Sequence, residues 1–229
     1  MSSDARKKKK KEDLPFEKRL QRELIAWLWV AVIFLLINGT LGQARVIPSA
    51  SMESTLLIGD HLIMSRLGYD AGVPFTPWHV PLWRSFRRQQ VVVFRPPFDP
   101  AAPDYVKRVI GLPGDVVEIK DGAVWVNGLK LAEPYLDAPM NAREHRGPYK
   151  VPLDSYFVMG DNRDDSYDSR YWGFLPRSSI IGTPVIIYMS IEAPPGAWEP
   201  GQIRERVSAY ARALIHPRLV RWKRLFSTF

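Results

Sequence analysis

The sequence predicts a mainly β protein that follows a single N-terminal transmembrane helix. Residues 24–44 form a stretch of 21 residues without a charged side chain. After it, short runs rich in β-branched and aromatic residues recur between turn residues, which is typical of strands. Twenty prolines are dispersed along the chain and the body shows no long helical period, so an all-β assembly is favoured over an α/β one.

The uncharged stretch is long enough to cross a bilayer as a helix. At about 1.5 Å per residue it spans roughly 31 Å, the thickness of a hydrocarbon core. A cleavable signal peptide is the alternative, but the apolar run 24–37 is long for a signal core. Residues 1–23 carry nine Lys and Arg against five Asp and Glu. The positive-inside rule therefore predicts a cytoplasmic basic tail and an extracytoplasmic body.

Residues 45–200 are expected to form the β-rich domain. Two of its predicted strands flank a proline-rich turn and are expected to pair as a hairpin. Two others flank Asp121-Gly122, a stronger two-residue hairpin signal. The predicted strands comprise residues 91–94, 105–110, 116–119, 123–126, 156–159 and 184–189.

The net charge of +8 is concentrated at the two ends of the chain. Residues 45–200 hold sixteen basic and eighteen acidic side chains, so a nucleic-acid partner is not expected. Because the chain has no cysteine, disulfides, a thiolate nucleophile and cysteine-based metal sites are excluded.

The C-terminal segment 201–229 is predicted to be a basic amphipathic tail. Ile203, Val207, Tyr210 and Leu214 fall at helical spacing, and residues 202–229 carry seven basic side chains against one acidic side chain. Such a tail either lies on the lipid surface or packs on the protein body. Both interpretations are open at this point.

A cluster of hydroxyl residues follows the apolar stretch, at positions 49–55. It is either a linker or the site of a nucleophilic serine, which needs a base. No histidine lies in a recognisable triad pattern, whereas strand alternation puts Lys107 on one face with Tyr105 and Val109. Burial there lowers the pKa of an amine and makes it a base near neutral pH, but an exposed strand lysine is the simpler alternative.

The third notable segment, residues 160–173, is dense in charge yet nearly balanced. It is predicted to be a loop held by internal ion pairs, such as Asp168 with Arg170 or Asp161 with Arg163. A calcium loop is disfavoured, because Arg163 occupies a position that needs an oxygen ligand and no glutamate follows at the closing position. No metal site is predicted.

Taken in order, these segments resemble bacterial type I signal peptidases, also called leader peptidases. The resemblance rests on Pro48-Ser49-Ala50-Ser51-Met52, Gly59-Asp60, the run 105–115 and the run 160–173, and it covers most of residues 46–190. It implies a signal-peptidase-like β-fold catalytic domain.

The resemblance also implies a Ser-Lys dyad. Ser51 would be the nucleophile and Lys107 the general base, with an acyl-enzyme intermediate. Ser166 would orient the lysine amine, and Ser49 would stabilise the oxyanion together with the Ser51 backbone N–H. Four residues would support the loop that carries Ser166: Asp161, Arg163, Asp168 and Arg170.

Members of this family favour small side chains one and three residues before the cut. By analogy, shallow pockets are expected here, lined by Ile47, Met52, Leu56, Tyr105 and Val106. The implied partners are signal-peptide-bearing preproteins and the lipid bilayer, with no cofactor. The implied location is the bacterial inner (plasma) membrane, single-pass, with the catalytic domain on the periplasmic or outer side.

The chain departs from the family pattern in small ways. Ala50 stands where many members have glycine, and Ser54 where many have proline. The segment between residues 115 and 156 is short, so a reduced second β-subdomain is expected. The alternatives are a dedicated processing peptidase of the same superfamily and an inactive envelope binding module.

Overall fold

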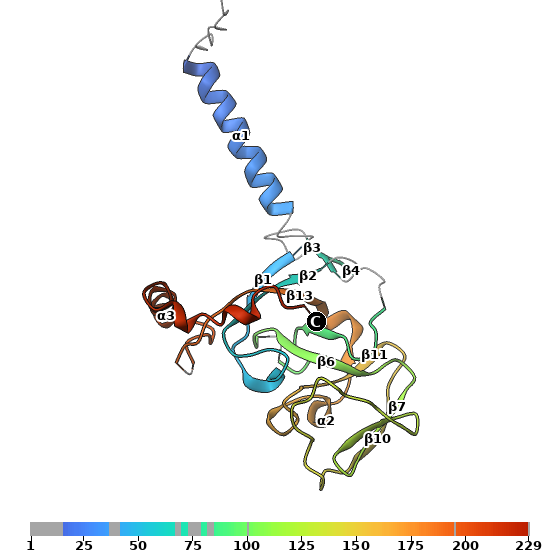
Figure 1. Cartoon of the computed structure of the whole chain (residues 1–229). Coiled ribbons are helices and arrows are strands. Elements are labelled where there is room, and N and C mark those ends of the chain that lie inside the picture. The colour runs from blue at the N-terminus through green and yellow to red at the C-terminus, as the bar shows by residue number, and fades with distance from the viewer. Residues whose placement is uncertain are drawn as a thin grey trace, which may run out of the picture.

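The computed structural model describes residues 16–36, 42–66, 70–72, 79–81, 85–99, 101–194 and 196–228. Within these residues two sheets and the helices α2 (Ser169–Trp172) and α3 (Ile203–Ile215) form the main body, with a separate two-stranded pair, and helix α1 (Phe16–Leu36) extends away from it (Figure 1). The prediction of a mainly β protein is confirmed (Figure 1). Most of the predicted tail 1–23 lies outside the described residues.

The N-terminal helix α1 (Phe16–Leu36) begins earlier than predicted. It includes Lys18, Arg19 and Arg22 ahead of the apolar run, because Glu, Lys and Arg are good helix formers. The prediction of a helix up to residue 44 is wrong at its end: residues 42–44 pair as a strand with β2, and residues 37–41 lie outside the described part. None of the described helices has both the length and the hydropathy that a membrane crossing requires.

A seven-stranded antiparallel sheet forms the main body, in the order β1-β2-β13-β5-β6-β11-β12. The predicted hairpin is confirmed, with Val91 opposite Arg108 and Phe94 opposite Tyr105. The strands are β1 (Gly42–Val46), β2 (Asp60–Ser65), β5 (Val91–Phe94), β6 (Tyr105–Gly111), β11 (Ser155–Met159), β12 (Leu175–Pro176) and β13 (Ile180–Ser190). A separate pair joins β3 (Asp70–Gly72) to β4 (His79–Pro81).

Core side chains cover both faces of this sheet. One cluster gathers Leu62, Met64 and Ile187 with residues from the serine-rich segment. Another gathers Phe94, Val109 and Val158. Their burial anchors β6 firmly, so side chains on this strand have fixed positions.

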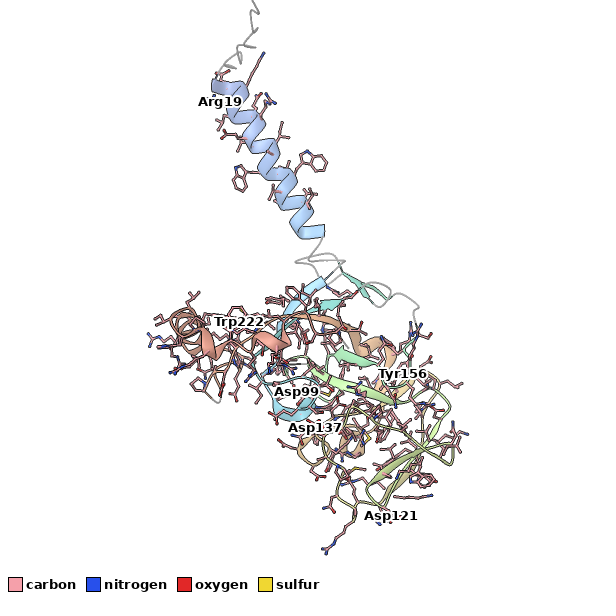
Figure 2. All side chains as sticks on the ribbon, viewed as in Figure 1. Arg19, Asp99, Asp121, Asp137, Tyr156 and Trp222 are labelled. Carbon is pink, nitrogen blue, oxygen red and sulfur yellow. The ribbon has the colours of Figure 1, made fainter. Side chains whose placement is uncertain are left out.

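The second sheet is small and has the order β10-β7-β8-β9. Its predicted central hairpin is confirmed: Asp121 and Gly122 both have positive φ, at 51° and 68°, as a type I′ turn requires. This sheet lies at the end of the body remote from α1 (Figure 1), and Figure 2 shows Asp121 at its tip. The strands are β7 (Val116–Lys120), β8 (Ala123–Val126), β9 (Leu129–Lys130) and β10 (Arg146–Lys150).

The C-terminal segment packs against the body through one face. Helix α3 (Ile203–Ile215) buries Ala209 and Ala213 beside Trp198 and Ile191. Further on, Arg224 Nη2 donates to the buried carboxylate of Asp60 at 2.6 Å. Short 3₁₀ turns η5 (Pro217–Leu219) and η6 (Trp222–Arg224) connect these contacts. For this face of the C-terminal segment, the alternative in which the tail packs on the protein body is therefore the correct one.

The opposite face of α3 exposes apolar side chains. Ile203, Val207 and Leu214 are between 61 and 84% exposed, and Trp222 and Phe226 beyond the helix are also exposed. Figure 2 shows Trp222 on the side of the body where α3 lies. The segment thus combines a docked face with an uncovered apolar one.

Candidate active site

Ser51 lies on a short 3₁₀ helix, η2 (Ala50–Met52), directly after the extended Ser49. Two neighbours in sequence anchor this turn: Met52 and Leu56 are fully buried, and the Leu56 N–H donates to the Met52 carbonyl at 2.7 Å. The Ser51 carbonyl accepts from the Asn162 N–H at 3.2 Å. Ser51 is thereby held between the core and the loop that follows β11.

Lys107 extends from β6 towards this turn. Its side chain is buried, with 3% of the residue exposed, so the exposed-lysine alternative is wrong. Lys107 Nζ donates to Ser51 Oγ at 2.5 Å. Strand β6 fixes the amine because its backbone pairs with β5 on one side, where Val92 is opposite Lys107.

The environment of Lys107 lowers its pKa from 10.5 to about 8. Burial is the main cause, since it penalises the ammonium form, while Asp168 and Asp161 partly offset it by attraction. Among the described residues Ser51 is the hydrogen-bond partner of Nζ, although an ammonium group has three protons to donate. Near neutral pH a useful fraction of this amine is therefore unprotonated.

Two further serines lie close to the pair. Ser49 Oγ is 3.5 Å from Ser51 Oγ. The buried Ser166 donates its hydroxyl proton to Asp168 Oδ2 at 2.8 Å, and the described residues show no hydrogen bond between Ser166 and Lys107. Gly160 allows this approach, because a Cβ there would collide with Ser166 Oγ and the Ser51 carbonyl. The predicted role of Ser166 stays a prediction.

The loop 160–173 is held by buried ion pairs, but not all are the predicted ones. Arg170 binds Asp168 with Nε and Nη2, each at 2.8 Å, as predicted. The predicted Asp161–Arg163 pair is wrong. Arg163, in the turn η3 (Arg163–Asp165), instead binds Glu133 and the Gly160 carbonyl.

Asp161 is paired with Arg108, the neighbour of Lys107 on β6. Arg108 Nε donates to Oδ1 at 2.8 Å and Nη2 to Oδ2 at 2.6 Å, and both side chains are buried. Thr55 adds a hydrogen bond to Oδ2 at 2.5 Å. These contacts occupy the carboxylate that a calcium loop would need, and they tie the serine turn, β6 and the loop together.

A cavity of about 470 Å³ opens beside Ser51 and Lys107. Of the five residues predicted to line it, Ile47, Met52, Tyr105 and Val106 do so. Leu56 does not, because its turn directs it into the core. Six further lining residues were not predicted from the sequence, although Tyr167 follows Ser166 directly. They are Pro48, Pro103, Asp104, Tyr167, Glu199 and Pro200.

A serine hydroxyl against a buried amine, beside a mostly apolar cavity, is the arrangement of a serine-type hydrolase that uses lysine in place of histidine. The comparisons with known proteins agree with this class. The family model described as signal peptidase, peptidase S26, matches residues 20–189. The chain belongs to this family, and the resemblance drawn from the sequence is confirmed.

Several relatives are similar over most of the chain. A probable signal peptidase I-2 of Synechocystis sp. is 39% identical, covering 83% of this chain and 89% of that protein. A signal peptidase I of Leptolyngbya laminosa is 39% identical, covering 70% and 75%. A signal peptidase I of Pseudomonas fluorescens is 35% identical, covering 72% and 71%.

Proposed function

We propose that this protein is a membrane-bound serine endopeptidase that removes signal peptides from exported preproteins. The observation that carries the proposal is the 2.5 Å contact between Ser51 Oγ and the buried Lys107 Nζ. Membership of the signal peptidase family supports the choice of substrate. A buried amine has no evident structural use beside a cavity, whereas as a base it activates the hydroxyl.

The reaction follows from this pair. Neutral Lys107 accepts the Ser51 hydroxyl proton as Oγ attacks the scissile carbonyl carbon, and the carbonyl electrons move to oxygen. The Ser49 hydroxyl and the Ser51 N–H donate to this oxyanion. Collapse breaks the C–N bond, and the Lys107 ammonium returns its proton to the departing amine. Lys107 then accepts a proton from a water molecule as the water oxygen attacks the acyl carbon. The bond to Ser51 Oγ breaks, and the Lys107 ammonium returns the proton to Oγ, which restores both side chains.

Ser166 acts as a positioning residue in this scheme. Its proton is donated to Asp168, so its oxygen lone pairs remain free to accept from the Lys107 amine. Asp168 is itself held by Arg170 and by the Gly160 N–H. Asp161, through Arg108, and Arg163, through Glu133, support the same loop.

The cavity suits an extended peptide with small side chains. The extended backbone at Ser49 and the start of β6 both border it. Strand β11 pairs with β6 only from Arg108 onwards, so among the described residues the edge of β6 at positions 105–107 has no partner strand on that side. Free strand edges bind peptides by backbone hydrogen bonds. Ile47, Met52, Tyr105 and Val106 would limit the side chains next to the cut.

The pH dependence of cleavage tests the role of Lys107. Purified protein is expected to cleave a preprotein with Ala-x-Ala at its signal end. With a pKa of about 8, the neutral fraction of the base is about 1% at pH 6, about 9% at pH 7 and about 91% at pH 9. The acylation rate, measured in single turnovers, should therefore rise about ninefold from pH 6 to 7 and about fivefold from pH 7 to 8, and then level off. A flat profile from pH 6 to 9 would contradict the proposal.

The anchor is assigned to the apolar residues that begin at Leu24 and end before β1 at Gly42. The basic residues 1–23 would stay in the cytoplasm, and the catalytic domain would lie on the outer side of the inner membrane. The relatives' name as signal peptidases supports this topology, since signal peptides are inserted in the same membrane.

The uncovered face of α3 is assigned to the lipid surface. Exposed Ile203, Val207 and Leu214 supply apolar contact, and the arginines of the tail suit anionic lipids. Because the chain contains no cysteine, one label can be attached at a single introduced thiol.

A fluorophore on Leu214→Cys in proteoliposomes should be quenched by lipids with brominated acyl chains, because the label enters the interface. The matched control is Leu153→Cys, which is 81% exposed and lies outside the tail. The control should show little quenching. Quenching at residue 214 that is as weak as at residue 153 would mean that α3 does not contact lipid.

A further inference from the structure

One wall of the active-site cavity comes from a segment outside the family-matched region. The match ends at residue 189, whereas Glu199 and Pro200 line the same cavity as Ser51 and Lys107. This wall lies beside the two side chains that we propose for the reaction. A wall in that position is a natural place for substrate selection.

The segment is held firmly in place. Trp198 is 1% exposed, and its ring packs edge-on against His61 at 4.8 Å between centroids. Arg206 of α3 donates through Nη2 to the carbonyls of Trp198 and Glu199, both at 2.9 Å. The docking of α3 thus fixes the backbone that presents Glu199.

The carboxylate of Glu199 is exposed and has no hydrogen bond or ion pair within the described part of the chain. Arg206 binds its carbonyl and not its carboxylate. The other acidic lining residue, Asp104, is paired with Arg45 at 2.8 Å. Lys107 is neutral when it acts as base. Glu199 therefore contributes an uncompensated negative charge to a mostly apolar cavity.

We infer that Glu199 is a specificity-determining residue that favours preproteins with a cationic side chain next to the cut and disfavours those with an acidic one. The inference rests on the proposed function. A charge that faces a peptide across an apolar, partly closed cavity is screened less than one in bulk water. At a separation of a few ångströms the preference of lysine over glutamate should reach about tenfold or more in kcat/KM.

The test uses the full-length protein and peptides that keep alanine one and three residues before the cut. Lysine, glutamine or glutamate is placed in turn two residues before the cut and at each of the two positions after it. For at least one position the wild-type protein should cleave the lysine peptide about tenfold faster than the glutamate peptide. Glu199→Gln should bring this ratio close to one, and Glu199→Lys should reverse it.

Glu192→Gln is the matched control, because Glu192 is exposed in the same segment but does not line the cavity. It should keep the wild-type ratio. A charge preference that Glu199→Gln leaves unchanged, or no preference at any position, overturns the inference while cleavage itself continues. If no peptide is cleaved at all, the proposed function fails instead. Thermal unfolding of Glu199→Gln at the wild-type temperature shows that the variant is folded, so a change in its ratio reports on the lost charge.

Discussion

Replacing Ser51 with alanine, or Lys107 with methionine, is expected to lower the cleavage rate by about 10³-fold or more. The first change removes the attacking oxygen and the second removes its base, and residues that act as a unit lose nearly all chemistry when either is missing. The rates are measured on a preprotein substrate in single turnovers. Because the two residues act in one step, the double variant should be no slower than the worse single variant.

The fold should survive both substitutions. The folded-state pKa of Lys107, about 8, lies below its ordinary value of 10.5, so below pH 8 the unfolded chain binds the proton more tightly. This costs the folded protein about 3 kcal/mol, a penalty that fades as the pH rises to about 10.5. Methionine removes the penalty, so Lys107→Met should unfold at the same or a higher temperature than wild type at pH 7.

Matched controls distinguish chemistry from general damage. Ser178 and Lys120 are exposed and lie outside the cavity, so Ser178→Ala and Lys120→Met should cleave at the wild-type rate. Normal turnover by Ser51→Ala or Lys107→Met would refute the assignment of the pair.

The second large effect concerns the buried pair of Arg108 and Asp161. Either Arg108→Met or Asp161→Asn should reduce the free energy of unfolding by about 3–5 kcal/mol, because each leaves a buried charge without its partner. Asp161 is fully buried, and Arg108 also stacks on the Tyr135 ring at 3.8 Å. Urea unfolding of each variant measures the loss.

A double variant shows how much of the lost free energy of unfolding comes from the broken ion pair. Arg108→Met with Asp161→Asn removes both charges, so it should be more stable than the sum of the single losses predicts. The matched control is Glu118→Gln, which breaks a solvent-accessible pair with Lys120 and should cost less than about 1 kcal/mol. Single losses of that small size at Arg108 and Asp161 would show that the pair does not tie β6 to the loop.

Much of the fold follows from local signals in the sequence. The hairpins around residues 91–110 and 116–126 were predictable because strand alternation and turn residues act over a few positions. The start of α1 was not, because charged helix formers extend a helix beyond its apolar run. The strand at residues 42–44 was also missed, because its pairing with β2 is decided by a partner about twenty residues away.

The serine, the lysine and the loop of the candidate site were predicted from the resemblance of their motifs, in this order, to those of signal peptidases. Their partners were less so. Arg163 has a nearby acidic residue in sequence, yet it binds Glu133, and Asp161 binds Arg108 from another strand. Leu56 is as apolar as Met52, so their sequence does not distinguish them. The turn at residue 52 places Met52 at the cavity and Leu56 in the core.

The sequence by itself determined the mainly β class and the family, and the resemblance to that family implies the nucleophile and base that we propose. Those properties depend on residue type and short spacing, which the chain displays directly. Only the tertiary structure decided that Lys107 is buried against Ser51, that Arg108 neutralises Asp161, and that Glu199 faces the cavity. The physical reason is that burial and pairing depend on groups brought together from distant parts of the chain, and these set the local dielectric and charge.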